Sequence, residues 1–268
     1  MGFGKAISYR DAKYALKFTE SLVQRIGDKI AKKASHRKRI SFKGEIDLVT
    51  QFDRKAQSMI VDALRRKYPE FGILSEEDID TDTGSEIRWI VDPLDGTTNF
   101  AHGLPIWAIS IGLEVGKSIL LGVVYDPNRR ETFSALKGHG AHLNGRKVHV
   151  SRTKRLEYSL LVTGFPYDIR RSKKNNLKQF NAFAVRARAV RRLGSAALDL
   201  CYTACGRFDG YWELKLSPWD QAAGSLILRE AGGRITDFSG RDFDIYGDEV
   251  LGTNGYIHRP MMRVLNPQ

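Results

Sequence analysis

The sequence predicts an α+β fold with an antiparallel-rich first half and an α/β second half. Three patterns indicate this: apolar residues at helical spacing over the first 70 residues or so, short apolar strands to about residue 150, and strands alternating with helices from about residue 155. The 268 residues, 42% of them hydrophobic, suffice for a large core, and no linker interrupts them. We therefore expect residues 1–154 and 155–268 to be two halves of one compact unit.

Two helices are expected before the first strand. Ser8 and Asp11 have the spacing of a capping box, and apolar residues follow at helical intervals over 15–30. Asp53 is a candidate N-cap for a second amphipathic helix that ends before Pro69. The segment F-G-I-L then predicts a short strand that leads into S-E-E-D.

Strands dominate the rest of the first half, and helices return in the second. W-A-I-S-I-G-L-E-V, S-I-L-L-G-V-V-Y and E-T-F-S-A-L predict strands, followed by a hairpin at Asn144-Gly145. The second half predicts, in order, strand L-L-V-T-G-F, a helix near 174–185, strand R-A-V-R-R, helix S-A-A-L-D-L-C-Y-T-A-C, strand F-D-G-Y-W-E-L, helix P-W-D-Q-A-A-G-S-L-I-L-R-E-A-G-G, and strands near 234–237 and 249–253.

Composition limits the class of protein. No apolar run reaches the length of a membrane span and no signal sequence begins the chain, so we expect a cytoplasmic protein. Cys201 and Cys205 are expected to be two small buried residues rather than a disulfide or a zinc site. The formal net charge of +12 favours anionic substrates, nucleic acid or an acidic partner, with a solvated surface rich in ion pairs as the plainer alternative.

The stretch W-I-V-D-P-L-D-G-T-T-N-F, residues 89–100, carries the main chemical signal. Pro93 cannot donate a ladder hydrogen bond and should end the strand, so that Asp92 and Asp95 converge at a turn. Gly96 permits close approach of a ligand, and the residues after it supply hydroxyls and amides at the start of a helix. The stretch therefore predicts a site for a hard cation beside a place for phosphate.

Other acidic segments could join this site. Glu76 or Glu77 follows a short strand, and Asp220 lies in the first turn of a helix, where capping explains it equally well. D-I-D-T-D-T-G, residues 78–84, is similar to a calcium loop but has its glycine one place late, so we interpret it as a solvated loop beside the metals. The sequence has no G-x-S-x-G motif and no P-loop, which disfavours serine hydrolases and nucleotide-dependent kinases.

These motifs, in this order and spacing, resemble the inositol monophosphatase family of Mg²⁺-dependent, lithium-sensitive phosphatases. The resemblance extends from about residue 8 to residue 265, and T-G-F-P-Y, residues 163–167, is similar to bacterial members. It implies a layered α-β-α-β-α sandwich of the inositol monophosphatase and fructose-1,6-bisphosphatase type. It also implies two or three Mg²⁺ ions per subunit.

The resemblance assigns residues to roles. The implied ligands of the first ion are Glu76, Asp92 and the carbonyl of Leu94; those of the second are Asp92, Asp95 and Asp220; and Glu76 helps to hold a weaker third ion through water. The implied catalytic group is Glu76 with a hydrogen-bonded pair, Asp53 and Thr97, that orients the attacking water. The implied substrate contacts are Gly96 and Thr97 for phosphate, Gly194, Ser195 and Ala196 as the wall for the polyol, Glu213 for a ring hydroxyl, and Lys43 on a mobile loop over the metals.

The expected reaction is hydrolysis of a phosphomonoester by in-line attack of metal-activated water. Inositol 1-phosphate is the first candidate substrate, with fructose 1,6-bisphosphate and the 2′-phosphate of NADP as alternatives. A second phosphate would need cations, for which the candidates are Arg170, Arg171, Lys173, Lys174, Arg191 and Arg192, although a solvated basic surface explains them equally well. The resemblance implies a homodimer, possibly a tetramer, and some bacterial relatives also bind components of the transcription machinery. The net charge of +12 would also allow binding to RNA or an acidic partner.

Overall fold

The computed structural model describes residues 7–35, 45–77 and 79–267. The expected lysine of a mobile loop, Lys43, lies outside the described residues. No helix in the part of the chain that is described is both long and apolar enough to cross a membrane.

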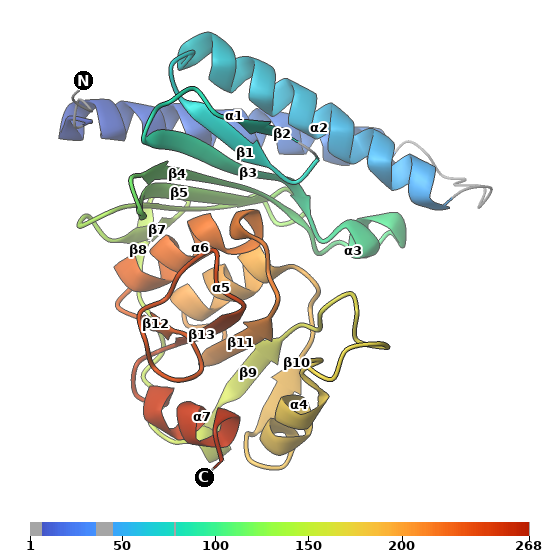
Figure 1. Ribbon diagram of the computed structural model, residues 1–268, viewed down its shortest axis with the longest axis vertical. Helices are drawn as coiled ribbons and strands as arrows, with labels where there is room; N and C mark the ends of the chain where they lie inside the picture. The colour runs from blue at the N-terminus through green and yellow to red at the C-terminus, as the bar shows by residue number, and fades with distance from the viewer. Residues whose placement is uncertain (1–6, 36–44, 78, 268) are drawn as a thin grey trace.

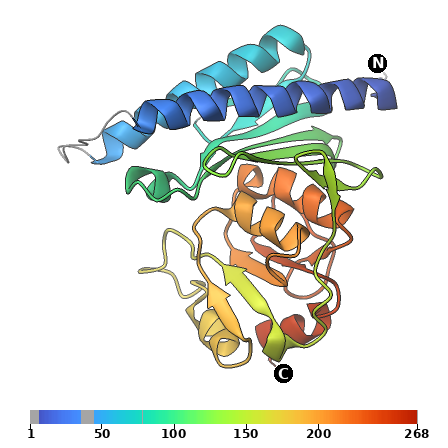
Figure 2. The same ribbon diagram turned by 180° about the vertical axis from the view of Figure 1, so that it is seen from behind.

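Five layers succeed one another from one end of the molecule to the other (Figure 1). Helices α1 (Tyr9–Ser35) and α2 (Glu45–Lys67) cover the outer face of a large sheet, as the view from behind also shows (Figure 2). The large sheet has the order β2-β1-β3-β4-β5-β6-β7-β8, with bounds β1 Gly72–Ser75, β2 Ile79–Thr81, β3 Ile87–Asp95, β4 Ala108–Val115, β5 Ser118–Asp126, β6 Glu131–Leu136, β7 Ala141–Leu143 and β8 Arg146–Val148.

Helices α5 (Ala196–Ala204) and α6 (Pro218–Glu230) form the middle layer between the two sheets (Figure 1). The smaller sheet has the order β10-β9-β11-β13-β12, with bounds β9 Leu160–Thr163, β10 Ala189–Arg191, β11 Gly210–Leu214, β12 Arg234–Thr236 and β13 Glu249–Thr253. Helices α4 (Leu177–Ala184) and α7 (His258–Leu265) cover its outer face, while the short α3 (Thr97–Ala101) and the 3₁₀ helix η1 (Leu156–Tyr158) lie in connections.

The layered α+β sandwich predicted from the sequence is confirmed. In the large sheet only β1 and β3 pair in parallel, whereas β9 pairs in parallel with both β10 and β11 in the smaller sheet. The separation into halves at residue 154 stays a proposal. Apolar side chains of α5 and α6 pack against strands of both sheets, so these helices belong to a shared core.

The first predicted helix is confirmed, and the start of the second was predicted wrongly. Ser8 Oγ accepts from the Asp11 backbone N–H at 3.2 Å, as a capping box requires. The second helix begins at Glu45, not after Asp53, because no proline or glycine interrupts the eight residues before Asp53. Asp53 instead lies in the middle of α2, on its buried face, with only 3% of its surface exposed.

Two short elements differ from the prediction. The segment 78–84, expected to be a solvated loop, contains β2, in which Thr81 pairs antiparallel with Ile73 of β1. Helix α7 was not predicted, because Pro260 interrupts its apolar pattern; proline is tolerated in the first turn, and Met261 and Leu265 face the core. Cys201 on α5 and Cys205 directly after it are free thiols; Cys201 is buried as expected, whereas Cys205 is half-buried.

Strand β3 does not end at Pro93, which corrects the prediction. Asp92 pairs with Ser110 and Asp95 pairs with Ala108, so three steps on β3 face two on β4. Proline lacks an N–H for the ladder, and the extra residue is accommodated as a bulge rather than as a strand end. The bulge turns both carboxylates toward one side of the sheet edge.

A pair of glycines lets α6 lie directly on the large sheet. Gly112 of β4 pairs with Gly122 of β5. A Cβ on Gly122 would meet the Ala223 backbone oxygen at 2.7 Å and its Cα at 2.8 Å, and a Cβ on Gly112 would meet the Ala222 Cβ at 3.2 Å. Helix α6, which carries Asp220 in its first turn, is therefore held at a fixed, close distance from β4 and β5.

Candidate active site

Three carboxylates meet where β3 ends and α6 begins. One oxygen atom from each of Asp92, Asp95 and Asp220 lies within 4.8 Å of the others. Asp92 and Asp95 are buried and Asp220 is half-buried. The two predicted motifs, far apart in the sequence, are thus brought together as expected from their chemistry.

Local backbone geometry fixes two of the three carboxylates. Asp92 Oδ1 accepts from the backbone N–H of Leu94 at 2.9 Å, inside the β3 bulge. Asp220 Oδ2 accepts from the backbone N–H of Ser217 at 2.7 Å, which closes a capping box at the start of α6. Asp220 therefore caps α6 and also lies in the acidic group.

Asp95 is held by the other half of the chain. Its Oδ2 accepts from Ser195 Oγ at 2.5 Å and from the Ala197 backbone N–H at 2.9 Å, and its Oδ1 accepts from the Ala196 N–H at 3.3 Å. Asp95 thus binds the N-terminal turn of α5, where a negative charge is favoured. Ser195 and Ala196, predicted as substrate wall, also anchor this carboxylate, a role that the sequence did not reveal.

Glu76 and Asp53 extend the acidic group. Glu76 follows β1, where its backbone N–H donates to the Val91 carbonyl at 3.3 Å, and burial raises the pKa of its carboxyl to about 7. Burial, followed by the charges of Glu77 and Glu76, raises the pKa of Asp53 to about 8. Both predicted acids therefore lie in the electrostatic field of one site.

The acidic group fits a divalent cation. Burial and then the charge of Glu76 raise the pKa of Asp92 well above its ordinary value, and burial and then the charge of Asp95 do the same for Asp220. Burial also raises the pKa of Asp95, to about 6, although the hydrogen bond from Ser195 lowers it. None of the ion pairs found among the described residues involves these carboxylates. Close buried carboxylates of this kind are stabilised by cations with a preference for oxygen ligands, such as Mg²⁺.

The stretch after Asp95 is shaped by Gly96. Its φ of +98° and the 2.9 Å that would separate a Cβ from the Ile106 carbonyl oxygen both require glycine. The Thr97 hydroxyl donates to the Leu94 carbonyl at 3.1 Å, and no Asp53–Thr97 hydrogen bond is found among the described residues. The expected pair is thus not formed here, because Thr97 reaches the carbonyl three residues back; that carbonyl keeps a second lone pair for a cation.

The predicted polyol wall is attached to the same stretch through Asn99. Its Nδ2 donates to the Ile106 carbonyl at 2.9 Å and to the Leu193 carbonyl at 2.8 Å. Gly194, at φ +88°, packs against this amide, since a Cβ there would lie 3.1 Å from Asn99 Nδ2. The sequence indicated Asn99 only as one of the residues at a helix start that favours an anion; its bonds to these carbonyls were not predicted.

Glu213 lies behind the wall on β11. Burial raises its pKa to about 7, and Tyr211 donates to its Oε2 at 2.8 Å. A Cβ on Gly164 would come within 2 Å of Glu213 Oε1, so Gly164 lets the T-G-F-P-Y segment pass over this carboxyl. One further acid was missed: Asp199 on α5 is fully buried, neither of its carboxyl oxygens has a hydrogen-bond partner, and burial raises its pKa well above the ordinary range.

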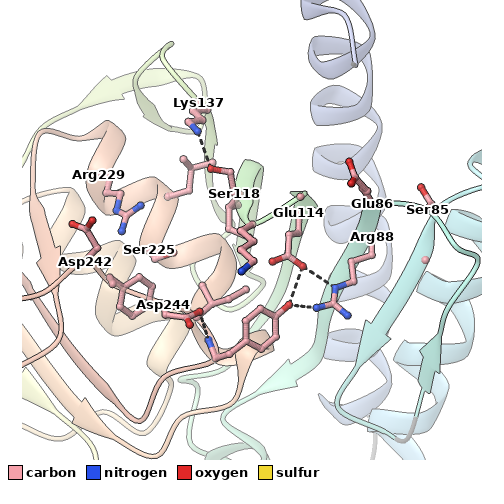
Figure 3. A pocket seen from close by; sticks show the side chains of 18 of the residues that line it. Ser85, Glu86, Arg88, Glu114, Ser118, Lys137, Ser225, Arg229, Asp242 and Asp244 are labelled. Atoms are coloured by element: carbon pink, nitrogen blue, oxygen red, sulfur yellow. Dashed lines mark hydrogen bonds and ion pairs between the residues drawn. The ribbon is translucent and has the colours of Figure 1, made fainter. Parts of the chain in front are cut away.

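A hollow of about 990 Å³ lies elsewhere (Figure 3). Its wall includes Arg88 at the start of β3, hydrogen-bonded to Glu114 at 2.7 Å, and Tyr246, which donates to Glu114 at 2.8 Å. Arg229 near the end of α6 faces the same hollow. The carboxylate site lies at the opposite ends of β3 and α6, so the two do not overlap.

Removal of divalent ions is expected to destabilise the protein more at about pH 8.5 than at about pH 6.5. Glu76 and Asp53, with pKa values of about 7 and about 8 in the folded chain, bind protons more tightly there than in the unfolded chain, so the free energy of unfolding falls as the pH rises through this window. Mg²⁺ at about 100 times its dissociation constant should restore about 2.7 kcal/mol, or roughly 5 to 10 °C in Tm. Thermal unfolding with chelator and with Mg²⁺ at both pH values measures this; a Mg²⁺ effect that is larger at the lower pH would contradict it.

Known proteins share this arrangement. A model of the inositol monophosphatase family matches residues 11–266. The chain is 45% identical over 220 residues to an inositol-1-monophosphatase of Synechocystis sp., covering 82% of this chain and 77% of the relative. It is 41% identical to a protein named Nus factor SuhB of Pseudomonas aeruginosa, covering 82% of this chain and 83% of that protein.

Solved structures resemble this chain in both fold and sequence. The inositol monophosphatase of Anabaena (Nostoc) sp. superposes with a TM-score of 0.87 at 38% identity, covering 94% of this chain and 95% of that one. An enzyme of the same kind from Thermotoga maritima gives a TM-score of 0.82 at 35% identity, covering 94% and 96%. The sequence, the layered fold and the convergence of two separate motifs on one acidic site place this chain in the inositol monophosphatase family, whose members are phosphoric monoester hydrolases.

Proposed function

We propose that the protein is a Mg²⁺-dependent phosphatase that hydrolyses inositol 1-phosphate to inositol and phosphate. The observation that carries this proposal is the convergence of Asp92, Asp95 and Asp220, each with an oxygen directed at the other two. The similarity to an inositol-1-monophosphatase supports the choice of substrate.

The geometry of the acidic group and the family support a proposal for the metal ligands. Glu76, Asp92 and the Leu94 carbonyl would hold one ion, and Asp92, Asp95 and Asp220 would hold a second. A third ion would bind more weakly through water at Glu76. Bound Mg²⁺ supplies positive charge that activates water and stabilises the oxygen of the leaving group.

The chain's own groups bind and orient the reactants. We assign the phosphate to the backbone at Gly96 and to Thr97, and the polyol to the wall of Gly194, Ser195 and Ala196. The attacking water is held by Glu76 and Thr97 in line with the bond to the leaving alcohol, and Glu76 accepts its proton while the alcohol oxygen leaves and is protonated by solvent. Asp53 belongs to the same acidic group, where burial and then the charges of Glu77 and Glu76 raise its pKa. Lys43 is assigned to substrate binding on the family resemblance alone.

Glu213 is the group proposed to select the alcohol. It is buried behind the wall and has one carboxyl oxygen occupied by the Tyr211 hydroxyl. Its other oxygen can accept from a ring hydroxyl. A site that provides a buried partner for a hydroxyl discriminates strongly against esters that lack it.

One observation favours fructose 1,6-bisphosphate as a second candidate substrate. The Arg192 guanidinium reaches the polyol wall, where its Nη1 lies 2.8 Å from the position of a Cβ on Gly194. A second phosphate on the substrate would meet this cation. Lys174, also considered for this role, forms ion pairs with Asp248 and Glu249 and is less suited.

Partners beyond the substrate are proposals that rest on relatives. We propose a homodimer, possibly assembled further, in the cytoplasm, and RNA or the transcription machinery as an additional partner, since several relatives are named Nus factor SuhB. Some of the described basic residues form ion pairs with acids, for example Arg207 with Glu131 and Lys215 with Asp168. Binding of nucleic acid through the other basic residues should weaken steeply as the salt concentration rises.

The decisive experiment is phosphate release from inositol 1-phosphate, fructose 1,6-bisphosphate and NADP, each with Mg²⁺ and with chelator. We expect Mg²⁺-dependent turnover, highest for inositol 1-phosphate. A higher kcat/KM for fructose 1,6-bisphosphate would shift the assignment to the second candidate, and Arg192→Ala should then raise KM for that substrate alone. Folded protein with no turnover of any ester would overturn the proposed function.

A further inference from the structure

Tyr167 is the most exposed of the large hydrophobic side chains in the described part of the chain. Its side chain is 95% exposed, against 53% for Tyr158 and Tyr256. Covering the apolar surface of an exposed aromatic ring lowers the free energy. The surroundings of Tyr167 therefore indicate which molecule could cover its ring.

The segment that carries Tyr167 is attached beside the proposed site at two points. On one side, Gly164 passes directly over the carboxyl of Glu213. On the other, Asp168 accepts from Lys215 Nζ at 2.7 Å, and Lys215 lies between Glu213 and the start of α6. Tyr167 thus lies on a short arch, residues 164–168, between Glu213 and the start of α6.

Further bonds hold this arch in place. Asn176 Nδ2 donates to the Gly164 carbonyl at 2.6 Å, and the Trp212 indole N–H donates to Asn176 Oδ1 at 2.6 Å. Phe165 packs against Phe180 of α4, with 5.5 Å between ring centroids. The segment between β9 and α4 projects on the same side of the molecule as α3, which follows the Asp95 turn (Figure 1). Because these contacts already fix the arch, little further conformational entropy is lost when Tyr167 contacts a ligand.

The electrostatics agree with a position above the carboxylates. Desolvation, followed by the charges of Glu76, Asp220, Asp95 and Asp92, raises the pKa of the Tyr167 phenol to about 12. A ring that is almost fully exposed and whose pKa is still affected by all four carboxylates lies near the acidic group rather than away from it.

We propose that Tyr167 is a specificity-determining residue that covers the outer face of the substrate, with its ring stacked on the C–H face of a cyclic polyol or sugar phosphate. This proposal rests on the proposed phosphatase function. Aromatic rings pack well on the C–H face of a sugar or polyol ring, and the phenol hydroxyl can bond to a substrate hydroxyl or to water. An acyclic phosphate ester offers no such face, so Tyr167 would select for rings while the carboxylates do the chemistry.

The test compares KM and kcat of wild type, Tyr167→Ala and Tyr167→Phe on inositol 1-phosphate and on acyclic glycerol 2-phosphate. Loss of a stacked ring should raise KM for inositol 1-phosphate roughly fivefold to tenfold in Tyr167→Ala, with kcat little changed. KM for glycerol 2-phosphate should not change, and Tyr167→Phe should keep most of the wild-type value.

Tyr256→Ala is the matched control. Tyr256 is 53% exposed and follows β13 next to Thr253, which pairs with Gly210 at the end of β11 opposite to Glu213. It should leave both KM values unchanged. Equal KM values for wild type and Tyr167→Ala on inositol 1-phosphate would overturn the role of Tyr167, as would a fall in oligomer mass in Tyr167→Ala, which would assign the ring to a subunit contact. Failure of the wild type to hydrolyse either ester would instead overturn the phosphatase function itself.

Discussion

Replacing Asp95 by asparagine is expected to lower kcat/KM for phosphate release by roughly three orders of magnitude or more, because bound Mg²⁺ stabilises the transition state by several kcal/mol. The substitution removes one of three converging charges. The asparagine carbonyl can still accept from Ser195 Oγ and the Ala197 N–H, so the attachment of α5 is kept. The fold should therefore survive while the cation affinity falls.

The experiment needs two readouts and one matched variant. Mg²⁺ titration of activity should show a higher ion requirement for Asp95→Asn, and circular dichroism should show an unchanged secondary structure. Asp62→Asn changes the same charge on an exposed part of α2 and should keep wild-type kcat/KM. Wild-type activity in Asp95→Asn at the same Mg²⁺ concentration would exclude Asp95 as a metal ligand.

Gly122→Ala is expected to lower the free energy of unfolding by about 3 kcal/mol and to reduce activity. The new Cβ would meet the backbone of Ala223 at 2.7 and 2.8 Å, and a helix backbone cannot turn aside as a flexible side chain can. Helix α6 must then move away from β5. Because Asp220 lies in the first turn of α6, the same movement displaces one of the three converging carboxylates.

Gly112→Ala provides the graded comparison. Its Cβ would meet the Ala222 Cβ at 3.2 Å, a side-chain contact that can adjust, so we expect a loss of about 1 kcal/mol. Urea unfolding of both variants with chelator present separates packing from metal binding. Equal midpoints for the two variants would show that the distance between α6 and the sheet is not set by Gly122.

The sequence predicted the acidic site well because each acid occurs at a place with its own local signature. Asp92 and Asp95 stand beside a proline in a strand, and Asp220 stands behind a serine and a proline at a helix start. Such signatures depend on neighbours along the chain. They predicted which of these acids converge without the fold being known in detail.

Contacts between distant segments could not be predicted in this way. The bonds of Asp95 to α5 and of Asn99 to the Leu193 carbonyl join residues about a hundred positions apart, and no local pattern encodes such a pair. The position of Asp53 was also misjudged, since a helix start can be placed at any good cap that precedes an apolar pattern. Buried Asp199 sits in an apolar helix, where only the packing shows that it has no partner.

Each converging carboxylate accepts a hydrogen bond that fixes it in place: Asp92 from the Leu94 N–H, Asp95 from the Ser195 hydroxyl and Asp220 from the Ser217 N–H. None of the three side chains is therefore free to swing outward and enlarge the ring of oxygens. A metal site whose oxygen atoms cannot move apart selects ions by radius, because a larger ion such as Ca²⁺ needs longer bonds and more ligands than Mg²⁺. We therefore expect Ca²⁺ to bind this site more weakly than Mg²⁺. The hydrogen bonds that shape the strand bulge and the two helix starts would then also determine which ion is bound.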